Sequence, residues 1–324
     1  MTKSSRLVVI AIATSLLWFG LAARTCAQTN PPMASEQRDR QKESLFNQIT
    51  EYRRSPNPDQ QRLAYPTAKA YLRQFGGDND RYAKEVQKFV DEYERRAHAG
   101  EVFQAYSARD YAKTFELGRP LLQKAPEDFF LLATLTEAGY EDALAGHATL
   151  NTETVDYARR AIALLEAGQV TQADPFKSIE VARGFLNSAL GLFLKDQSPV
   201  EAAAAFLKAA KSDSPYRTDP TIYRRLGVAI LKGEFAQISA KYNEEFGTKP
   251  PSQEQAAMLE RVGHVAERAI DAYARAVALS TRPEQQDAKS KILVQLTELY
   301  KNFHNNSDAG LSELISTVLA KPLP

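Results

Sequence analysis

Hydrophobic residues recur at spacings of three and four along almost the whole chain from residue 35 onward, and alanine is abundant among them. This spacing places apolar side chains on one face of an α-helix, whereas a β-strand would show an alternation of period two rich in Val, Ile and Thr. The pattern therefore predicts an all-α protein of about 12–13 helices. The expected helices cover residues 36–54, 59–75, 80–107, 110–124, 127–145, 152–167, 175–195, 199–211, 220–232, 234–246, 252–280, 284–304 and 308–320.

Local signals indicate where several of these helices begin. Asp174-Pro175 and Asp219-Pro220 each offer an N-cap carboxylate followed by a proline in the first turn, where the missing N–H has no cost. Ser198 and Glu201 have the three-residue spacing of a capping box, in which each side chain bonds the backbone N–H of the other residue. Pro120 lies inside the fourth expected helix, and we expect it to kink or split that helix.

Internal repeats change the interpretation of this pattern. Leu190-Gly191, Leu194, Ala203, Leu207 and Pro215 have the offsets of the 34-residue tetratricopeptide motif, W-x2-L-G-x2-Y followed by A-x3-F and P. On these residues the chain resembles a tetratricopeptide repeat protein. The resemblance implies a right-handed superhelical solenoid of antiparallel helix pairs, and a bundle of alanine-rich helices is the alternative fold.

A second unit follows, and degenerate units flank the two. Leu226-Gly227 repeats the first pair of residues, and Gly233-Glu234-Phe235 stands where the turn between the two helices of that unit is expected. Ala269, Tyr273 and Ala276 have the spacing of another second helix. The resemblance then covers residues 95–320, although no unit carries the tryptophan of the motif.

The resemblance also implies where a partner would bind. The first helix of each pair lines the concave face of such a solenoid, and the family uses that face to hold peptides or partner proteins. Carried onto the matched positions, the partner-binding groove consists of Phe103, Tyr106, Leu192, Lys195, Arg224 and Val228. Aromatic and arginine side chains are frequent among residues that dominate binding energy. The alternative is that the apolar members pack between helices and that the cations are simply solvated.

The first residues have the pattern of a secretory signal peptide. Lys3 and Arg6 precede an apolar run over residues 7–23, and the small residues Thr25 and Ala27 stand three and one positions before a cut ahead of Gln28. We therefore expect export to the periplasm or the exterior. One alternative is an uncleaved membrane anchor formed by the apolar run, which is at the short end of what spans a bilayer.

A second alternative is acylation of Cys26, although Ala23-Arg24-Thr25 before it does not match the pattern of a lipoprotein signal. The sequence predicts four segments. They are a signal peptide over 1–27, a spacer over 28–35, an N-terminal helical pair over 36–79 that serves as a divergent repeat or cap, and a repeat domain over 80–324.

Charge and composition exclude several classes of partner. The chain has 41 basic and 40 acidic residues, so no overall field favours nucleic acid or an anionic membrane. Residues 1–27 contain three basic and no acidic residues, which leaves 38 against 40 after cleavage. The single cysteine lies in the same segment, so the mature chain has no disulfide and we expect no membrane span in it.

No motif indicates a metal, a cofactor or a catalytic centre, and we expect none of the three. The four histidines are scattered, and the sequence has no H-E-x-x-H, phosphate loop, G-x-G-x-x-G or G-x-S-x-G. Residues 76–80 read Gly-Gly-Asp-Asn-Asp, which resembles part of a calcium loop but lacks its later ligands. We interpret them as a glycine helix stop followed by an aspartate cap.

These observations favour a non-enzymatic, exported scaffold that binds a protein or peptide. A membrane-tethered subunit of an envelope-assembly machine is one alternative, with residues 7–23 retained. An enzyme on a helical superhelix, cleaving peptidoglycan or another polysaccharide with glutamate acids, is the other. Buried carboxylates with perturbed protonation would favour the enzyme, and an open groove would favour binding.

Overall fold

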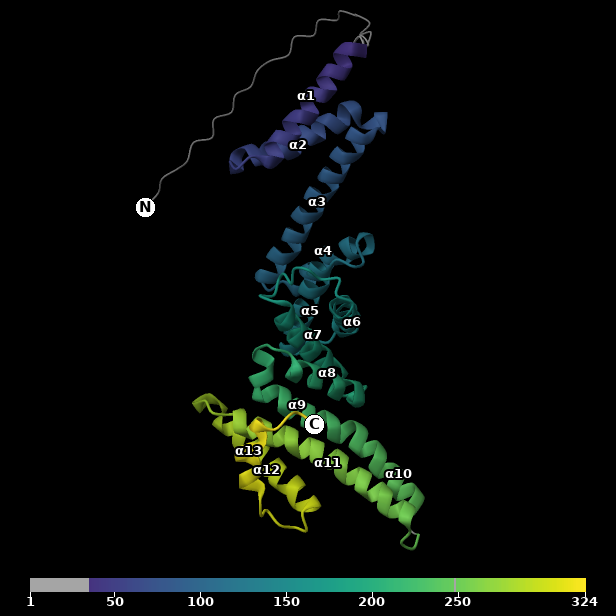
Figure 1. The fold of residues 1–324 in the computed structure, drawn as a ribbon, viewed down its shortest axis with the longest axis vertical. Coiled ribbons are helices and arrows are strands. Elements are labelled where there is room, and N and C mark those ends of the chain that lie inside the picture. Colours follow the sequence, from purple (N-terminus) through teal and green to yellow (C-terminus); the bar gives the residue numbers. More distant parts are fainter. Residues whose placement is uncertain (1–34, 248) are drawn as a thin grey trace, which may run out of the picture. The chain divides into compact units, whose positions relative to one another are not determined.

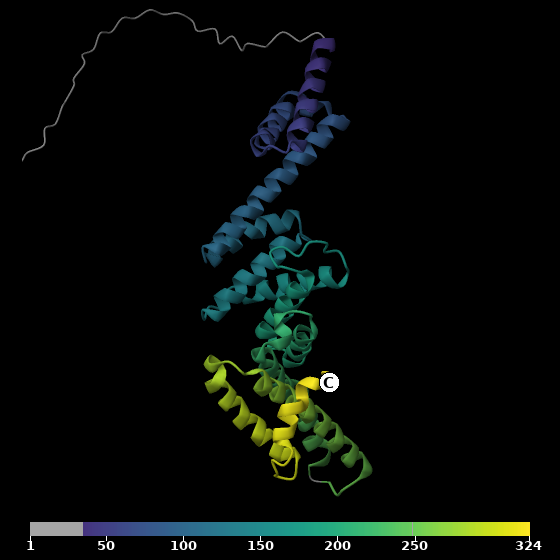
Figure 2. The same ribbon diagram turned by 60° about the vertical axis from the view of Figure 1, so that its left-hand side comes forward.

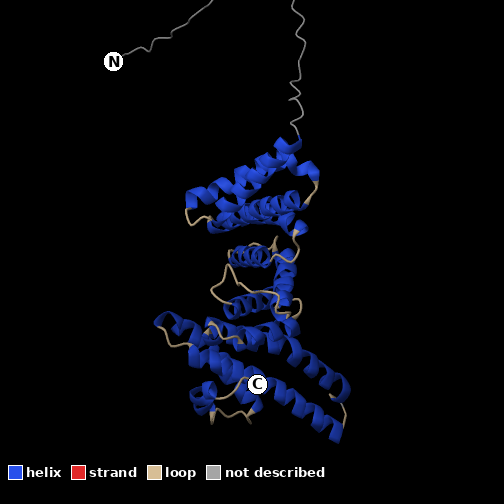
Figure 3. Ribbon diagram, turned by 45° about the horizontal axis from the view of Figure 1, so that its top comes forward, coloured by secondary structure: helices blue, strands red, loops and turns tan. Residues whose placement is uncertain are grey.

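The computed structural model describes residues 35–247 and 249–324, and these residues form helices joined by turns and loops, with no strand among them (Figure 3). The expectation of an all-α chain is confirmed. The predicted signal peptide, the apolar run over 7–23 and Cys26 lie outside the described residues. Within the described part, no helix has the length and apolar character needed to cross a bilayer.

The chain divides into two compact units after Val90, within helix α3 (Arg81–Ser107). The first unit contains α1 (Ser35–Arg54), α2 (Pro58–Phe75) and the beginning of α3. Its core is small and forms where the three helices meet, because each helix contributes one apolar stripe. The core residues are Ile49, Ala68, Tyr71, Phe75, Ala83, Val86 and Val90.

Ion pairs join α1 to the junction between α2 and α3. Lys42 Nζ lies 2.6 Å from Asp78 Oδ2 and also binds Asp80, while Arg38 Nη2 lies 2.5 Å from Asp78 Oδ1. Hydrogen bonds from Arg38 and Lys42 lower the pKa of Asp78 to about 2, and the same contacts raise the pKa of Lys42. Asp80 Oδ1 accepts from the backbone N–H of Ala83 at 2.9 Å and so caps α3, as expected.

The second unit contains the remainder of α3 and ten further helices, and all of them except α10 contribute side chains to one continuous core. They are α4 (Tyr111–Lys124), α5 (Phe129–Leu144), α6 (Asn151–Glu166), α7 (Ile179–Leu194), α8 (Pro199–Lys211), α9 (Pro220–Ile230), α10 (Ala236–Phe246), α11 (Gln253–Leu279), α12 (Gln286–Phe303) and α13 (Leu311–Thr317). From α4 to α9 each helix packs on the next in chain order, then α9 packs on α11 and α11 on α12 (Figures 1 and 2).

Three glycines allow close contact between paired helices. A Cβ at Gly191 would lie 2.8 Å from the ring of Phe206, and a Cβ at Gly227 would lie 3.0 Å from the ring of Tyr273. In each pair, a side chain of one helix therefore fills the space that is left free because the glycine of the other helix has no side chain. The three pairs are Gly139 with Thr154, Gly191 with Phe206, and Gly227 with Tyr273. In the Gly139 pair and in the Gly191 pair, the glycine and its contact residue are fifteen positions apart in the sequence (139 to 154 and 191 to 206).

The start of α7 differs from the prediction. The Asp174-Pro175 bond is cis, and the helix begins later, at Ile179, where Ser178 accepts a hydrogen bond from the backbone N–H of Val181. An Asp-Pro pair suits a turn as well as a helix start, so the dipeptide alone did not distinguish the two. Asp219 does cap α9, through the N–H of Thr221 at 2.8 Å, as predicted.

The capping box predicted at the start of α8 is wrong. Ser198 makes no side-chain cap bond at α8, and Glu201 instead binds Arg159 of α6 at 2.8 and 2.9 Å. A charge-assisted pair with an arginine is stronger than a bond to a neutral N–H, so the capping box is not formed. Of the two outcomes predicted for Pro120, a kink or a split, the split does not occur, because α4 continues through Pro120 to Lys124.

Gly233 is not in a turn. A π-helical segment, Leu231–Phe235, joins α9 to α10, so the chain is helical from Pro220 to Phe246. Gly233 is buried because α8 begins against it: a Cβ there would lie 2.8 Å from the backbone nitrogen of Val200. The chain reverses only after α10, and α10 then lies beside the first part of α11 (Figures 1 and 3). The partner helix of α9 is thus α11.

Candidate functional site

The six predicted groove residues lie in pairs on three helices of the second unit. Phe103 and Tyr106 are on α3, Leu192 and Lys195 are at the end of α7, and Arg224 and Val228 are on α9. None of the contacts of the α3 pair reaches the other four residues.

The α3 pair belongs to an aromatic cluster. Phe103 is 38% exposed, and its ring centroid lies 6.0 Å from those of Tyr106 and Phe130. Tyr106 is half-buried, and burial together with the nearby carboxylates Glu137 and Glu141 raises its pKa to about 12. Tyr106 therefore keeps its proton and presents a hydroxyl beside a negatively charged part of α5.

The α7 and α9 residues combine half-buried apolar side chains with exposed cations. Leu192 and Val228 are half-buried, and Val228 packs against the core. Lys195 is exposed and pairs with Asp196 at 3.0 Å, so it is not a free cation. Arg224 is exposed and has no described carboxylate within ion-pair distance, which leaves its guanidinium available to a partner.

Arg225 on α9 shows that α5, α7 and α9 share one face. Its Nη1 atom lies 3.5 Å from the hydroxyl of Tyr140 on α5, although 85 residues separate the two. Tyr140 also makes an edge contact with Phe185 of α7 at 5.3 Å, and the Phe185 ring contacts Phe176 at 5.3 Å. We call the side of α5, α7 and α9 that carries Tyr140, Leu192 and Val228 the inner face.

Sequence reasoning missed Tyr140, although a signal for it exists. Tyr140, Leu192 and Val228 each directly follow a glycine that packs against a partner helix, namely Gly139, Gly191 and Gly227. Residues in the same register of similar helices point in the same direction. Ala138-Gly139 was overlooked because alanine stands where the other two units have leucine.

Two unpaired carboxylates lie at the α5 end of this region. Glu137 and Glu141 are one helical turn apart and so project from the same side of α5, and neither has a described cation within ion-pair distance. Burial and the neighbouring Glu141 raise the pKa of Glu137 to about 7. Glu137 can therefore hold or release a proton near neutral pH and can either donate or accept a hydrogen bond.

The described residues contain no cluster of three or more His, Cys, Asp or Glu side chains that could hold a metal ion. Each described histidine instead lies near one carboxylate. His147 Nδ1, for example, is 2.8 Å from Asp142, and His98 Nδ1 is 3.3 Å from Glu101. Asp78 and Asp80 at the calcium-loop-like segment face Lys42, which occupies the place a cation would need.

Comparison with known proteins identifies no relative. No family model matches the chain, and neither a curated protein nor a solved structure matches it.

Proposed function

We propose that the chain is an exported, non-enzymatic scaffold that binds a protein or peptide on the inner face of a tetratricopeptide-like array. The observation that carries the proposal is the contact between Arg225 and Tyr140, because it brings α9 beside α5, where Tyr140 also contacts Phe185 of α7. A surface built from three separate helices and carrying aromatic, aliphatic and arginine side chains has the composition of binding hot spots.

Repeated contacts support a tetratricopeptide-like arrangement. The Gly139 and Gly191 pairs have the same offset, and Gly227 makes the equivalent contact after a longer intervening segment that contains α10. Stacked helix pairs of this kind generate a right-handed superhelix with an extended concave surface. In this proposal the pairs are α5 with α6, α7 with α8, and α9 with α11.

The charges of this face favour a partner that binds in one orientation. Glu137 and Glu141 make the α5 end acidic, while Arg224 and Arg225 make the α9 end basic. Complementary charge aligns an extended segment before close contact forms. We therefore expect a segment with a basic group toward Glu137 and Glu141 of α5 and an acidic group toward Arg224 of α9.

Site-specific photo-crosslinking tests this proposal. A photoreactive phenylalanine analogue at Leu192 of the full chain should yield adducts with a partner from envelope or secreted fractions. The matched control carries the analogue at Val294, which is 58% exposed on α12 and remote from α7 in sequence. Adducts at Leu192 that disappear in the double variant Tyr140→Ala, Arg224→Glu would support the proposal. Absence of adducts, or identical adducts at both positions, would refute it.

An enzyme is the second candidate, and the protonation of Glu137 is the observation that favours it. A carboxyl that is partly protonated near neutral pH suits a general acid, and glycoside hydrolysis needs such a group together with a second carboxylate. Hydrolysis of peptidoglycan by the purified chain that is lost in Glu137→Gln but retained in Glu244→Gln would replace the binding proposal with this one.

Export and anchoring are tested by the mass of the protein recovered from cells. A mature chain that begins at Gln28 supports cleavage, while retention of residues 7–23 supports the membrane-tethered assembly subunit. Acylation at Cys26 would add the mass of the lipid. Tryptophan fluorescence gives an independent readout, because Trp18 is the only tryptophan of the chain.

A further inference from the structure

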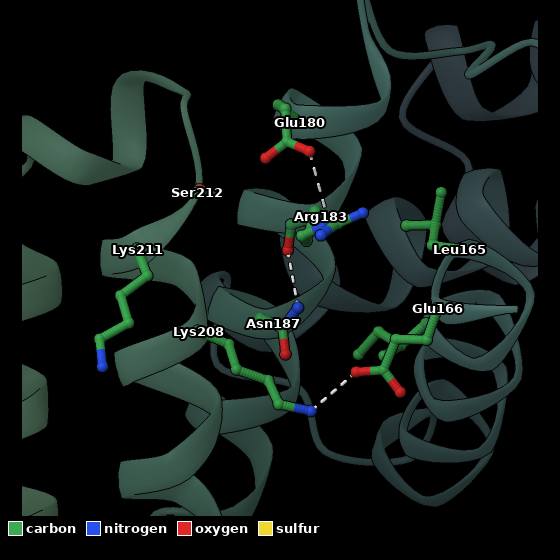
Figure 4. Close-up of a pocket in the computed structure, with 9 residues that line it drawn as sticks. Leu165, Glu166, Glu180, Arg183, Asn187, Lys208, Lys211 and Ser212 are labelled. Atoms are coloured by element: carbon green, nitrogen blue, oxygen red, sulfur yellow. Dashed lines mark hydrogen bonds and ion pairs between the residues drawn. The ribbon is translucent and has the colours of Figure 1, made fainter. Parts of the chain in front are cut away.

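A small pocket lies between α6, α7 and α8 (Figure 4). Its volume is about 240 Å³, which suits a small metabolite rather than a peptide. Ile162 and Leu165 of α6 form an apolar part, and charged side chains from all three helices surround it. On α7 the pocket is lined by Glu180, Arg183 and Asn187. These residues lie on nearly the opposite side of the helix from Leu192, so the pocket is distinct from the inner face.

The charges around the pocket leave one cation in excess. Lys208 Nζ binds Glu166 at 2.8 Å. Arg183 Nε lies 3.7 Å from Glu180, which is too long for a hydrogen bond. Lys211 has no described carboxylate within ion-pair distance. Three cations and two carboxylates therefore give a site that favours a ligand with a single negative charge.

Two polar groups in the pocket have unused hydrogen-bonding capacity. The Nε atom of Arg183 is buried and has no hydrogen-bond partner among the described residues. Asn187 is only 2% exposed, and its Nδ2 donates to the backbone carbonyl of Arg183 at 2.9 Å. Its amide oxygen accepts from no described donor and is not fully buried, so it can accept a hydrogen bond from a molecule in the pocket (Figure 4).

We propose that this pocket binds a small organic monocarboxylate that also carries a hydrogen-bond donor. Arg183 and Lys211 bind the carboxylate, the Asn187 amide oxygen accepts from the donor, and the carbon skeleton packs on Ile162 and Leu165. Arginine suits this role because its planar N–H groups match the two oxygens of a carboxylate. The site does not depend on the function proposed for the inner face.

Calorimetric titration of the full chain at constant ionic strength tests the proposal with three probes. L-Lactate carries a carboxylate and a hydroxyl, propionate lacks only the hydroxyl, and inorganic phosphate carries the alternative anion. We expect saturable binding of L-lactate with a Kd of about 1 mM, and weaker binding of both other probes. The hydroxyl should improve affinity over propionate by roughly fivefold, the contribution of one net hydrogen bond.

Variants assign the binding to the pocket. Arg183→Gln and Lys211→Gln should each weaken L-lactate binding about tenfold, since each removes a charge-assisted hydrogen bond. Both side chains reach solvent, so the variants should fold, which circular dichroism checks. Lys291→Gln on α12 is the matched control and should bind like the parent chain. Non-saturable binding, tighter binding of phosphate, equal binding of propionate, or unchanged binding in both pocket variants would overturn the proposal.

Discussion

The ring of Tyr273 packs against the backbone of Gly227, although α10 and its connections separate the two residues along the chain. The same kind of contact joins Gly191 to Phe206 within a short stretch. Contact between two helices at a glycine is therefore retained while the length of chain between the helices varies. Single substitutions of these glycines can therefore measure how much the contact contributes to the stability of the protein.

Adding a methyl group at these glycines should destabilise the second unit to different degrees. Gly191→Ala would place a Cβ 2.8 Å from the Phe206 ring and should cost about 2–3 kcal/mol, because a rigid ring cannot move aside locally. Gly227→Ala would place its Cβ 3.0 Å from Tyr273 and should cost about 1 kcal/mol. Urea unfolding monitored by circular dichroism measures both.

Gly263→Ala is the control for helix propensity. Gly263 lies inside α11, and no heavy atom lies within 4 Å of the position its Cβ would take. The substitution should stabilise the protein by about 0.5–1 kcal/mol, since alanine is the better helix former. A loss of stability at Gly263→Ala similar to that at Gly191→Ala would contradict the steric explanation.

The hairpin formed by α10 and the first part of α11 should be dispensable for folding. No residue of α10 is buried, so removing the hairpin exposes little of the core. Replacing residues 240–257 by a short turn of Gly and Asn should change the unfolding midpoint by no more than roughly 2–4 °C. Differential scanning calorimetry measures the shift, and loss of the cooperative transition would show that the hairpin supports α9 and α11.

Glu137 should make the protein less stable at high pH. Its pKa of about 7 in the folded chain exceeds the ordinary value of 4.5, so the folded state binds the proton more tightly than the unfolded state. Its stabilising effect is complete below pH 4.5 and is lost as the pH rises through 7. Glu137→Gln should therefore be more stable than the parent by about 2 kcal/mol at pH 8 and equal to it at pH 4.

Urea unfolding at the two pH values measures this difference, and carbon NMR of the carboxyl group reports the pKa directly. Glu244→Gln, at an exposed position of α10, should show no such dependence. Equal stability of Glu137→Gln and the parent at both pH values would mean that the Glu137 carboxylate is well solvated in the folded state.

Asp78 should have the opposite dependence and act on the first unit. Its pKa of about 2 lies below the ordinary value of 3.8, so its stabilising effect is present above pH 4 and is lost as the pH falls through 2. Asp78→Asn should speed amide hydrogen exchange in α1 at pH 6, because Arg38 and Lys42 lose their shared partner. Glu51→Gln, on the exposed side of α1, is the control and should leave exchange unchanged.

The sequence predicted the helices well because their periodicity is strong. The expected helix over 199–211 coincides with α8, and the cap at Asp219 is formed as predicted. Glycine was harder to interpret. Gly233 suggested a turn, but it is inside a continuous helix because the backbone of Val200 approaches it, and a contact with another helix leaves no local trace in the sequence.

The candidate site was predictable only in part, for a related reason. Phe103, Leu192 and Val228 could be chosen from the spacing of a single helix, and each lies at least partly exposed. The contact between Arg225 and Tyr140 and the raised pKa of Glu137 depend on how several helices are brought together. Such properties arise from packing between distant segments, which periodicity does not encode.

The segment between Gly227 and Tyr273 has a practical consequence for protein engineering. The chain already accommodates an extra helical hairpin between two paired helices and keeps their contact. The exposed connection at Asp196-Gln197, between α7 and α8, occupies the equivalent place in another pair. A fluorescent reporter or affinity tag inserted there would follow a design that the protein already uses, and would leave both chain ends free.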